Sequence, residues 1–392
     1  MKSLRLLSRF LLLLSFAAPA GAEPDSNGRA VRKEGDVVIY KNARFHSAFP
    51  SIVRRPDGEL LVAFRRAPDW RPLGAKGYTH TDPNSYLVSV RSTDAGKTWN
   101  TEPQLVFAHP FGGSQDPCLL QLRDGTIICG SYGWSFVQTN VLAALKKPVM
   151  NAGQFVFLGG WLLRSRDGGN SWEKPIVPPS SRNELRLDLF GKPVPAYNRG
   201  ALCEGTDGRI FWAVAARDAS ASPRTSVHLM ISEDKGTTWR YSCPIAASDK
   251  VEFNETSLYE TPKGDLVAFL RTAGFEDHTC VARSTDGGKS FQKWQDSGFQ
   301  GHPHFALRLP DERVLLVYGY RHAPMGIRAR VLDSECTDFS TAKEIVLRDD
   351  GGSEDLGYPW ATMVGKDRVL VVYYFNQTNS TRHIAGTFLS IE

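Results

Sequence analysis

Four copies of one octapeptide constrain the fold of this chain more than any other feature of its 392 residues. The copies share the pattern Ser-x-Asp-x-Gly-x-(Thr/Ser)-(Trp/Phe) and run from Ser92 to Trp99, Ser165 to Trp172, Ser232 to Trp239, and Ser284 to Phe291. The Asp side chain can bond local backbone amides, the Gly can take a positive φ, and the terminal aromatic ring can pack inward. Each copy therefore predicts a tight hairpin turn with a structural task.

A second series of turns predicts how many repeating units the chain contains. Six turn dipeptides each precede a β-rich apolar run, at Asp57-Gly58, Asp124-Gly125, Asp207-Gly208, Lys263-Gly264, Asp311-Glu312 and Lys366-Asp367. Units of this kind, recurring every roughly 50 to 80 residues, cannot bury their faces without neighbours. The sequence therefore predicts an all-β, six-bladed β-propeller, whose last blade is completed by an N-terminal strand near residues 37–40.

The N-terminus has the order of charge, apolar run and small residues that is typical of a secretory signal peptide. Lys2, Arg5 and Arg9 precede the apolar residues 11–16, and small residues continue to Ala22, after which we expect cleavage. No later stretch approaches the roughly 18 apolar residues of a membrane span. We therefore expect a secreted or periplasmic protein in which residues 23–392 form a single propeller domain.

Charge and cysteine content exclude several classes of function. The formal net charge of +5 includes three basic residues of the expected signal peptide, so the remaining chain is nearly balanced and shows no nucleic-acid footprint. The six cysteines match neither a paired zinc motif nor a dense disulfide framework. Cys118 and Cys129 could form a disulfide or remain buried thiols. We expect no metal and no cofactor, and the oligomeric state stays open.

The segment from Asn254 to Glu260 resembles the sialidase family, and the resemblance covers nearly all of residues 23–392. In that family a glutamate takes the proton of a tyrosine nucleophile, because a phenol with a pKa of about 10 attacks poorly at neutral pH. The resemblance implies Glu255 as this base and Tyr358 as the nucleophile. It also implies Asp82, on a first-blade loop, as the acid/base of a reaction that retains configuration.

The arginines that hold the substrate carboxylate in sialidases are only partly present in this sequence. Guanidinium groups suit that task because they form bidentate, charge-assisted hydrogen bonds. Ala48 stands where the first of three arginines is expected, and the segment around Thr279 lacks the second. The missing arginines therefore weaken the case for sialic acid as the substrate. Another acidic sugar, or a sugar without a carboxylate, is still a possible substrate. The substrate-binding candidates are Arg66, Arg271, Arg321 and Arg328.

Three further residues are candidates for sugar contacts, and they leave alternative functions open. Asp116 precedes a strand of the second blade and could accept a bond from a sugar hydroxyl, while His302 and His304 could donate hydrogen bonds or act as acid/base. The pair Glu255 and Tyr358 favours a retaining hydrolase acting on a glycan or glycoconjugate. The missing arginines favour a propeller glycosidase or polysaccharide lyase that uses a histidine. A non-catalytic glycan-binding propeller would show no turnover.

Overall fold

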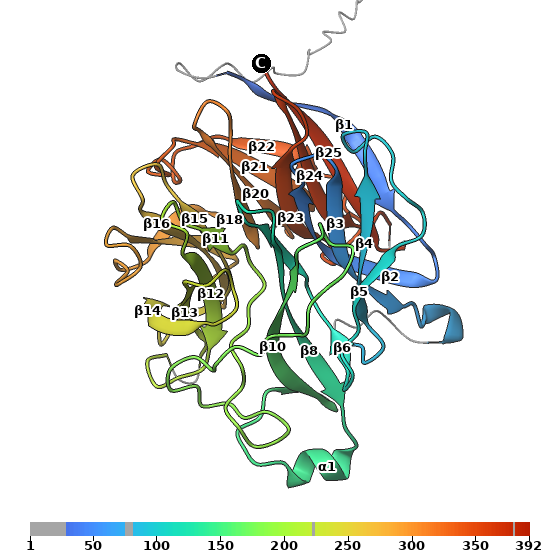
Figure 1. Ribbon diagram of the computed structural model, residues 1–392, viewed down its shortest axis with the longest axis vertical. Helices are drawn as coiled ribbons and strands as arrows, with labels where there is room; N and C mark the ends of the chain where they lie inside the picture. The colour runs from blue at the N-terminus through green and yellow to red at the C-terminus, as the bar shows by residue number, and fades with distance from the viewer. Residues whose placement is uncertain (1–28, 75–80, 222–223, 379–380) are drawn as a thin grey trace, which may run out of the picture.

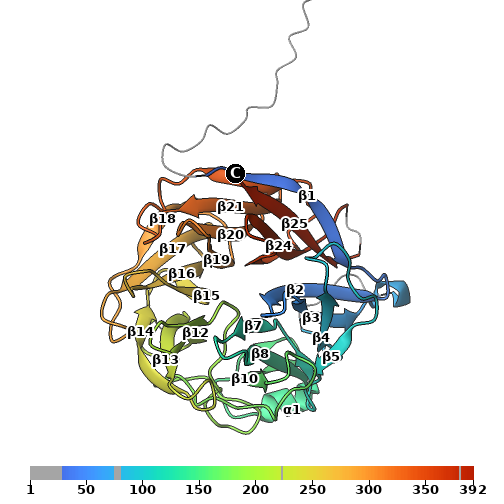
Figure 2. The same cartoon turned by 45° about the horizontal axis from the view of Figure 1, so that its top comes forward.

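The computed structural model describes residues 29–74, 81–221, 224–378 and 381–392. Within these ranges the strands form six sheets arranged in a ring, which confirms the predicted six-bladed β-propeller (Figures 1 and 2). The predicted signal peptide, residues 1–22, lies outside the described residues, so the division of the chain at Ala22 stays a prediction. The described residues contain no helix that is both long and apolar enough to cross a membrane.

Each sheet is one blade, and its strands follow one another in the sheet in nearly the order of the sequence. The first three blades contain β2 (Phe45–Arg54), β3 (Leu60–Pro68), β4 (Tyr86–Ser92) and β5 (Gln104–Phe107); β6 (Gly113–Ser114), β7 (Cys118–Gln121), β8 (Ile127–Phe136), β9 (Asn151–Ala152) and β10 (Phe155–Ser165); and β11 (Cys203–Glu204), β12 (Ile210–Ala216), β13 (Ser226–Ser232) and β14 (Arg240–Ala246). The last three contain β15 (Glu252–Glu260), β16 (Leu266–Ala273), β17 (His278–Ser284) and β18 (Gln295–Gln300); β19 (His304–Arg308), β20 (Val314–Tyr320), β21 (Gly326–Leu332) and β22 (Glu344–Arg348); and β23 (Gly357–Met363), β24 (Arg368–Phe375), β25 (His383–Ile391) and β1 (Val31–Tyr40).

The ring closes through the two ends of the described chain. Strand β1 pairs antiparallel with β25 and becomes the outermost strand of the last blade, with Val31 opposite Ile391 and Tyr40 opposite Ile384. The closing strand predicted near residues 37–40 is therefore confirmed, and it is longer than the sequence indicated. This pairing gives the last blade its fourth strand. It also joins the last blade to the first, because β1 leads directly into β2.

The four octapeptides form the predicted turns with one repeated geometry. In each copy the Ser hydroxyl donates to the Asp carboxylate at 2.8 or 2.9 Å and accepts the Gly amide at 2.8 to 3.0 Å. That Gly has a φ between +79° and +86°, which other residues adopt only with strain. A Cβ at Gly288 would lie 2.7 Å from Leu229 of the neighbouring blade, so these turns also pack adjacent blades together.

The six cysteines are all unpaired in the structure. Cys118 and Cys129 lie on neighbouring strands β7 and β8, but Cys118 is opposite Gly130 and Cys129 is opposite Leu119. Burial raises the pKa of both thiols. The structure therefore has two buried thiols at these positions and no disulfide between them.

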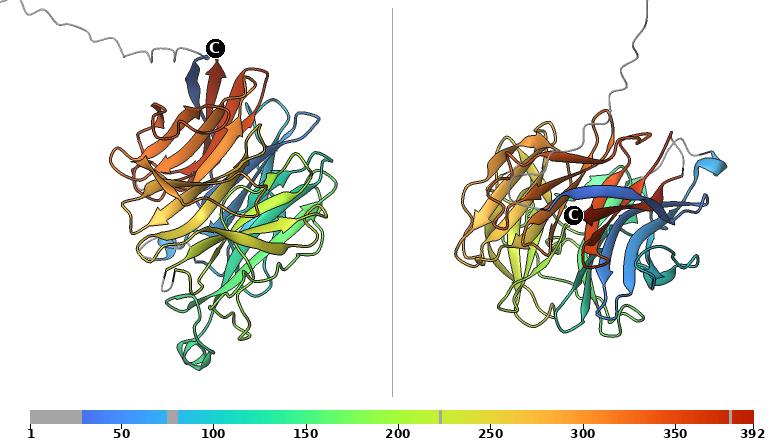
Figure 3. Two further views of the ribbon diagram at one scale, coloured as in Figure 1. Left: turned by 90° about the vertical axis from the view of Figure 1, so that its left-hand side faces the viewer. Right: turned by 90° about the horizontal axis from the view of Figure 1, so that it is seen from above.

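An extension of the second blade distinguishes one end of the ring. Strands β8 and β10 are the longest of their blade, and the connection between them carries the helix α1 (Thr139–Ala144), which projects beyond the blades (Figures 1 and 3). The segment that follows β10 is held by a buried ion pair between Arg186 and Glu184, with N···O 2.8 Å, and Arg186 also donates to Tyr197 at 3.1 Å. Tyr197 then packs on Phe157 with ring centroids 4.4 Å apart. The extension thereby supplies an aromatic wall to the pocket described next.

Candidate active site

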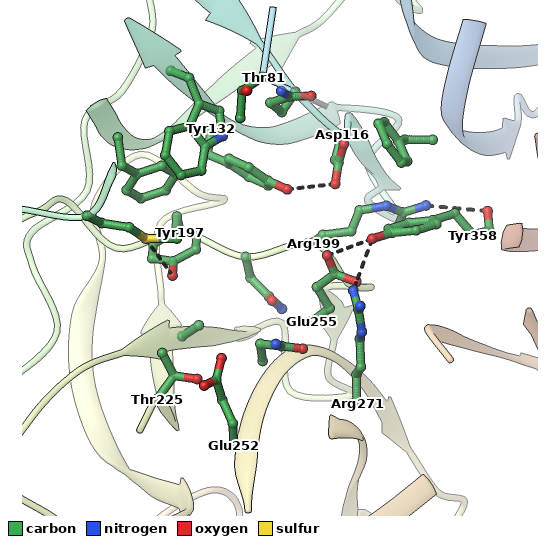
Figure 4. Close-up of a pocket in the computed structure, with 18 of the residues that line it drawn as sticks. Thr81, Asp116, Tyr132, Tyr197, Arg199, Thr225, Glu252, Glu255, Arg271 and Tyr358 are labelled. Carbon is green, nitrogen blue, oxygen red and sulfur yellow. Dashed lines mark hydrogen bonds and ion pairs between the residues drawn. The ribbon is translucent and has the colours of Figure 1, made fainter. Parts of the chain in front are cut away.

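A pocket of about 300 Å³ lies where the six blades converge. Every blade or the loop beside it contributes to the wall, and six of the lining residues, taken in order around the ring, are Phe49, Asp116, Arg199, Glu255, Arg321 and Tyr358. The second blade and its extension add aromatic side chains, including Tyr132 and Tyr197 (Figure 4). A site shared in this way can bring together residues that lie hundreds of positions apart in the sequence.

At the centre of the wall, the Tyr358 hydroxyl donates to Glu255 Oε1 at 2.8 Å. Arg271 Nη1 donates both to the Tyr358 oxygen, at 3.1 Å, and to the Glu255 carboxylate. Burial, followed by the Glu255 charge, raises the pKa of Tyr358 above its usual range, while Arg271 and Arg321 oppose the rise. The phenol is therefore neutral at rest, and it can attack only if Glu255 takes its proton as the new bond forms.

Local irregularities in three innermost strands direct side chains into this pocket. The register of β15 with β16 shifts between Asn254 and Ser257, and that of β23 with β24 shifts between Gly357 and Trp360, so Glu255 and Tyr358 both lie at bulges. Tyr358 has a φ of +53°, which is unusual for a residue with a side chain. Strand β2 has a similar shift next to Phe49. Bulges of this kind often re-aim side chains near binding sites.

Three arginines surround the Tyr358 side chain. Besides Arg271, the guanidinium of Arg199 lies 5.1 Å from the centre of the Tyr358 ring, and that of Arg321 lies 5.4 Å from it. Arg199 donates to the Pro50 carbonyl at 3.0 Å, so it is anchored beneath the nucleophile candidate. Sequence reasoning missed Arg199. The one sequence feature that could have identified it is its position just before the first strand of the third blade, because other residues that line the pocket lie in or beside the first strands of their blades.

Asp116 is the second buried carboxyl group on the pocket wall. It is 2% exposed, and Tyr132 donates to its Oδ2 at 2.7 Å, while its Oδ1 is buried without a hydrogen-bond partner among the described residues. Burial, followed by the charge of Glu255, raises the pKa of Asp116 to about 6, although Arg199 opposes the rise. Asp116 can therefore carry a proton near neutral pH.

Two of the predicted arginines point away from the pocket, which corrects their assignment. Arg66 donates to the hydroxyls of Tyr86 and Tyr40 at 2.9 and 3.0 Å and is not among the residues that line the pocket. Arg328 lies on β21, the third strand of its blade, and donates to the Pro324 carbonyl at 2.8 Å. Arg328 is likewise not among the residues that line the pocket.

The structure does not bring Asp82 onto the pocket wall, although the adjacent Thr81 lines it. Asp82 is 2% exposed, and its carboxylate accepts bonds from the Trp70 indole at 2.8 Å and from the backbone amide of Asn84 at 2.8 Å. Both carboxylate oxygens are therefore already bonded within the first-blade loop. This geometry differs from the one that the predicted acid/base role requires.

The two candidate histidines also lie outside the pocket wall. His302 and His304 are 4% and 2% exposed, and His304 Nε2 shares a 2.8 Å hydrogen bond with the Thr279 hydroxyl. Burial lowers the pKa of both rings, that of His304 to about 3, so they are neutral at physiological pH. Within the described ranges no group of three or more His, Cys, Asp or Glu residues could hold a metal ion.

Fold and pocket together define a six-bladed propeller with a tyrosine hydrogen-bonded to a glutamate where its blades meet. A family model described as a BNR repeat-like domain matches residues 148–371, and the chain belongs to this family. A crystal structure of a protein of unknown function from Dyadobacter fermentans is 61% identical to it, with a TM-score of 0.90 over 92% of this chain and 99% of that chain. No curated protein sequence matches the chain.

Solved sialidase structures share the fold at much lower identity. The Hadza microbial sialidase Hz136 is 17% identical, with a TM-score of 0.61 over 88% of this chain and 66% of that chain. The NanB sialidase of Streptococcus pneumoniae is 14% identical, with a TM-score of 0.60 over 94% and 71%. The Trypanosoma rangeli sialidase is 16% identical, with a TM-score of 0.59 over 91% and 58%. These likenesses confirm the predicted sialidase-type propeller.

Proposed function

We propose that this protein is a retaining exo-glycosidase that removes a terminal sugar from a glycan or glycoconjugate. The observation that carries the proposal is the 2.8 Å hydrogen bond from the Tyr358 hydroxyl to Glu255 in a pocket of about 300 Å³. In the proposed reaction the Tyr358 oxygen attacks the anomeric carbon and its proton moves to Glu255, which gives a covalent glycosyl-enzyme that water then hydrolyses. A pocket of this size suits one terminal sugar better than an internal segment of a chain.

We further propose that this sugar is acidic. Arg271 and Arg321 both flank Tyr358, and the charge of the Glu255 carboxylate acts on both. A substrate carboxylate next to the anomeric carbon would compensate the remaining positive charge. A neutral phenol also suits such a substrate, because an attacking carboxylate would repel it.

Simple sialosides should nevertheless be poor substrates. Ala48 replaces an arginine of the sialidase clamp, and the loss of one bidentate partner from a buried carboxylate costs on the order of a thousandfold in transition-state binding. Arg199 does not replace that arginine, because it is anchored to the Pro50 carbonyl beneath the Tyr358 ring. We expect better turnover of another terminal acidic sugar. Export from the cytoplasm, inferred from residues 1–22, is part of the same proposal.

The test is a screen of the purified protein with aryl glycosides, including an α-sialoside, other keto-acid sugars and hexuronides. With the best substrate, Tyr358→Phe should lower kcat/KM by at least about a thousandfold, because the nucleophile is lost. Tyr373→Phe is the matched control, since Tyr373 is also a buried tyrosine but bonds Thr387 in the last blade, outside the pocket. A fluorinated analogue of the same sugar should trap a covalent adduct on Tyr358, detected by peptide mass spectrometry.

Two results would reject this proposal. Wild-type protein that binds glycans without cleaving any of the glycosides would be a glycan-binding propeller. Full activity in Tyr358→Phe would exclude the tyrosine as nucleophile. The remaining alternative, a lyase or glycosidase using His302 or His304, has less support because neither ring lines the pocket.

A further inference from the structure

The proposed reaction needs a group that protonates the departing glycosidic oxygen, and two buried carboxyl groups compete for this role. Asp82 has the sequence position expected from the sialidase resemblance. Asp116 lines the pocket together with Tyr358 and Glu255, whereas Asp82 does not. A proton donor must reach its acceptor directly or through one water, so geometry is the first criterion.

The hydrogen bonds of the two carboxyl groups also differ. Asp82 accepts bonds at both oxygens, from Trp70 at Oδ2 and from Asn84 at Oδ1. At Asp116 only Oδ2 is engaged, by the Tyr132 hydroxyl, and the buried Oδ1 lacks a partner in the described part of the chain. A buried polar atom without a partner is costly unless a ligand or water satisfies it. Oδ1 of Asp116 is therefore the carboxyl oxygen that still needs a hydrogen-bond partner.

The Asp116 carboxyl group lies on the side of the pocket where an acid/base is expected. In Figure 4, Asp116 and Tyr132 lie on one side of the pocket, and Glu255 and Arg271 lie on the other. A retaining glycosidase needs its acid/base and its nucleophile on opposite faces of the sugar ring. A sugar bound between these two sides would have the phenol on one face and the Asp116 carboxyl near the leaving oxygen.

We infer that Asp116, rather than Asp82, is the acid/base of this enzyme; the inference rests on the proposed function. In the first step Asp116 donates its proton to the glycosidic oxygen as the bond between that oxygen and the anomeric carbon breaks. The Tyr358 oxygen simultaneously bonds the anomeric carbon and loses its proton to Glu255. In the second step the Asp116 carboxylate takes a proton from water, whose oxygen bonds the anomeric carbon. The bond to the Tyr358 oxygen breaks as the bond to water forms, and Glu255 returns the proton to the phenol.

The surroundings of Asp116 fit a group that must hold and release a proton. Burial and the Glu255 charge favour the protonated form and raise its pKa to about 6. Arg199, Arg65 and the Tyr132 hydroxyl favour the ionised form. The nearby Cys118 thiol stays protonated, because burial raises its pKa. The pKa of Asp116 therefore depends on a balance between burial with the Glu255 charge and the neighbouring hydrogen-bond donors and arginines, and small changes in the pocket shift it.

The experiment compares leaving groups in wild type, Asp116→Asn and Asp82→Asn, using the sugar that the wild-type enzyme cleaves best. A 4-nitrophenyl glycoside needs little protonation of the leaving oxygen, whereas an alkyl glycoside depends on it. Asp116→Asn should lower kcat/KM for the alkyl glycoside by about 100- to 10,000-fold and for the 4-nitrophenyl glycoside much less. Added azide should restore turnover of the 4-nitrophenyl glycoside and give a glycosyl azide of retained configuration. Asp82→Asn should affect both substrates by the same factor.

A graded variant tests the same role without removing the carboxyl group. Tyr132→Phe deletes the hydrogen bond that favours ionised Asp116, so the alkaline limb of the kcat/KM profile should move to higher pH. Circular dichroism of each variant verifies that the propeller is folded. Leaving-group dependence in Asp82→Asn instead of Asp116→Asn, or an alkaline limb that does not move in Tyr132→Phe, would overturn the role of Asp116 alone. An inactive wild-type protein would overturn the proposed function and this role with it.

Discussion

The burial of Asp116 predicts that replacing it will stabilise the protein near neutral pH. Its pKa of about 6 in the folded state lies roughly two units above the value of about 3.9 in an unfolded chain, and each unit corresponds to about 1.4 kcal/mol. Because the folded state binds the proton more tightly, stability falls as the pH rises from about 4 to about 6. Asp116→Asn removes this titration and keeps an oxygen that can accept from Tyr132. The variant should therefore be about 2 to 3 kcal/mol more stable at pH 7.5.

The assay is urea unfolding followed by tryptophan fluorescence at a series of pH values, with the unfolding free energy of each variant compared with that of wild type. The gain in Asp116→Asn should shrink on acidification and vanish near pH 4. Asp124→Asn is the control of opposite sign. Lys235, with N···O 2.8 Å, and the Thr126 amide lower the pKa of Asp124 to about 2, so its contribution is present at neutral pH and disappears on acidification. That variant should be less stable than wild type at pH 7.5.

A loss of stability in Asp116→Asn at pH 7.5, or a gain that does not change with pH, would refute the reasoning. The first result would mean that ionised Asp116 is stabilised by Arg199 and Arg65 more than burial destabilises it. The second would mean that the substitution acts through packing. Either outcome would also weaken the assignment of Asp116 as a proton donor, because a carboxyl group of ordinary pKa is almost fully ionised at pH 7.

Three further predictions follow from individual contacts. Arg199→Met should lower the unfolding free energy by about 3 kcal/mol in urea, because it removes a buried cation that bonds Pro50 and stacks on Tyr358, and unchanged stability would contradict that role. Arg271→Lys should keep the charge but lose the guanidinium group whose Nη1 contacts both Glu255 and Tyr358; kcat/KM for an acidic sugar should fall about 100-fold, and a loss under threefold would be inconsistent with that contact. Ser284→Ala should cost about 1 to 2 kcal/mol in the same urea assay by leaving a buried turn amide unbonded, and no cost would argue against the octapeptide as a stabilising turn.

The architecture could be predicted from the amino-acid sequence, because the information for each blade is local. Each octapeptide joins neighbouring strands through a Ser, an Asp and a Gly within five residues, so the turn forms wherever those residues occur. Repeated local turns followed by apolar strands leave few alternatives to a ring of blades. The resemblance to sialidases further pointed to Tyr358 and Glu255, and these side chains are within hydrogen-bond distance of each other.

Which other side chains face the pocket could not be predicted, because it depends on how the blades pack around the ring. Strand alternation cannot be extrapolated through the bulges of β2, β15 and β23. The inclusion of Arg66 and Arg328 failed because hydrogen bonds to Tyr40 and to the Pro324 carbonyl hold these side chains outside the pocket wall. Arg199 was missed because its contacts with Pro50 and Tyr358 join parts of the chain more than a hundred residues apart. The titration of Asp116 likewise depends on burial between blades and on the charges of Glu255 and Arg199 across them, and neither is encoded in its neighbours along the chain.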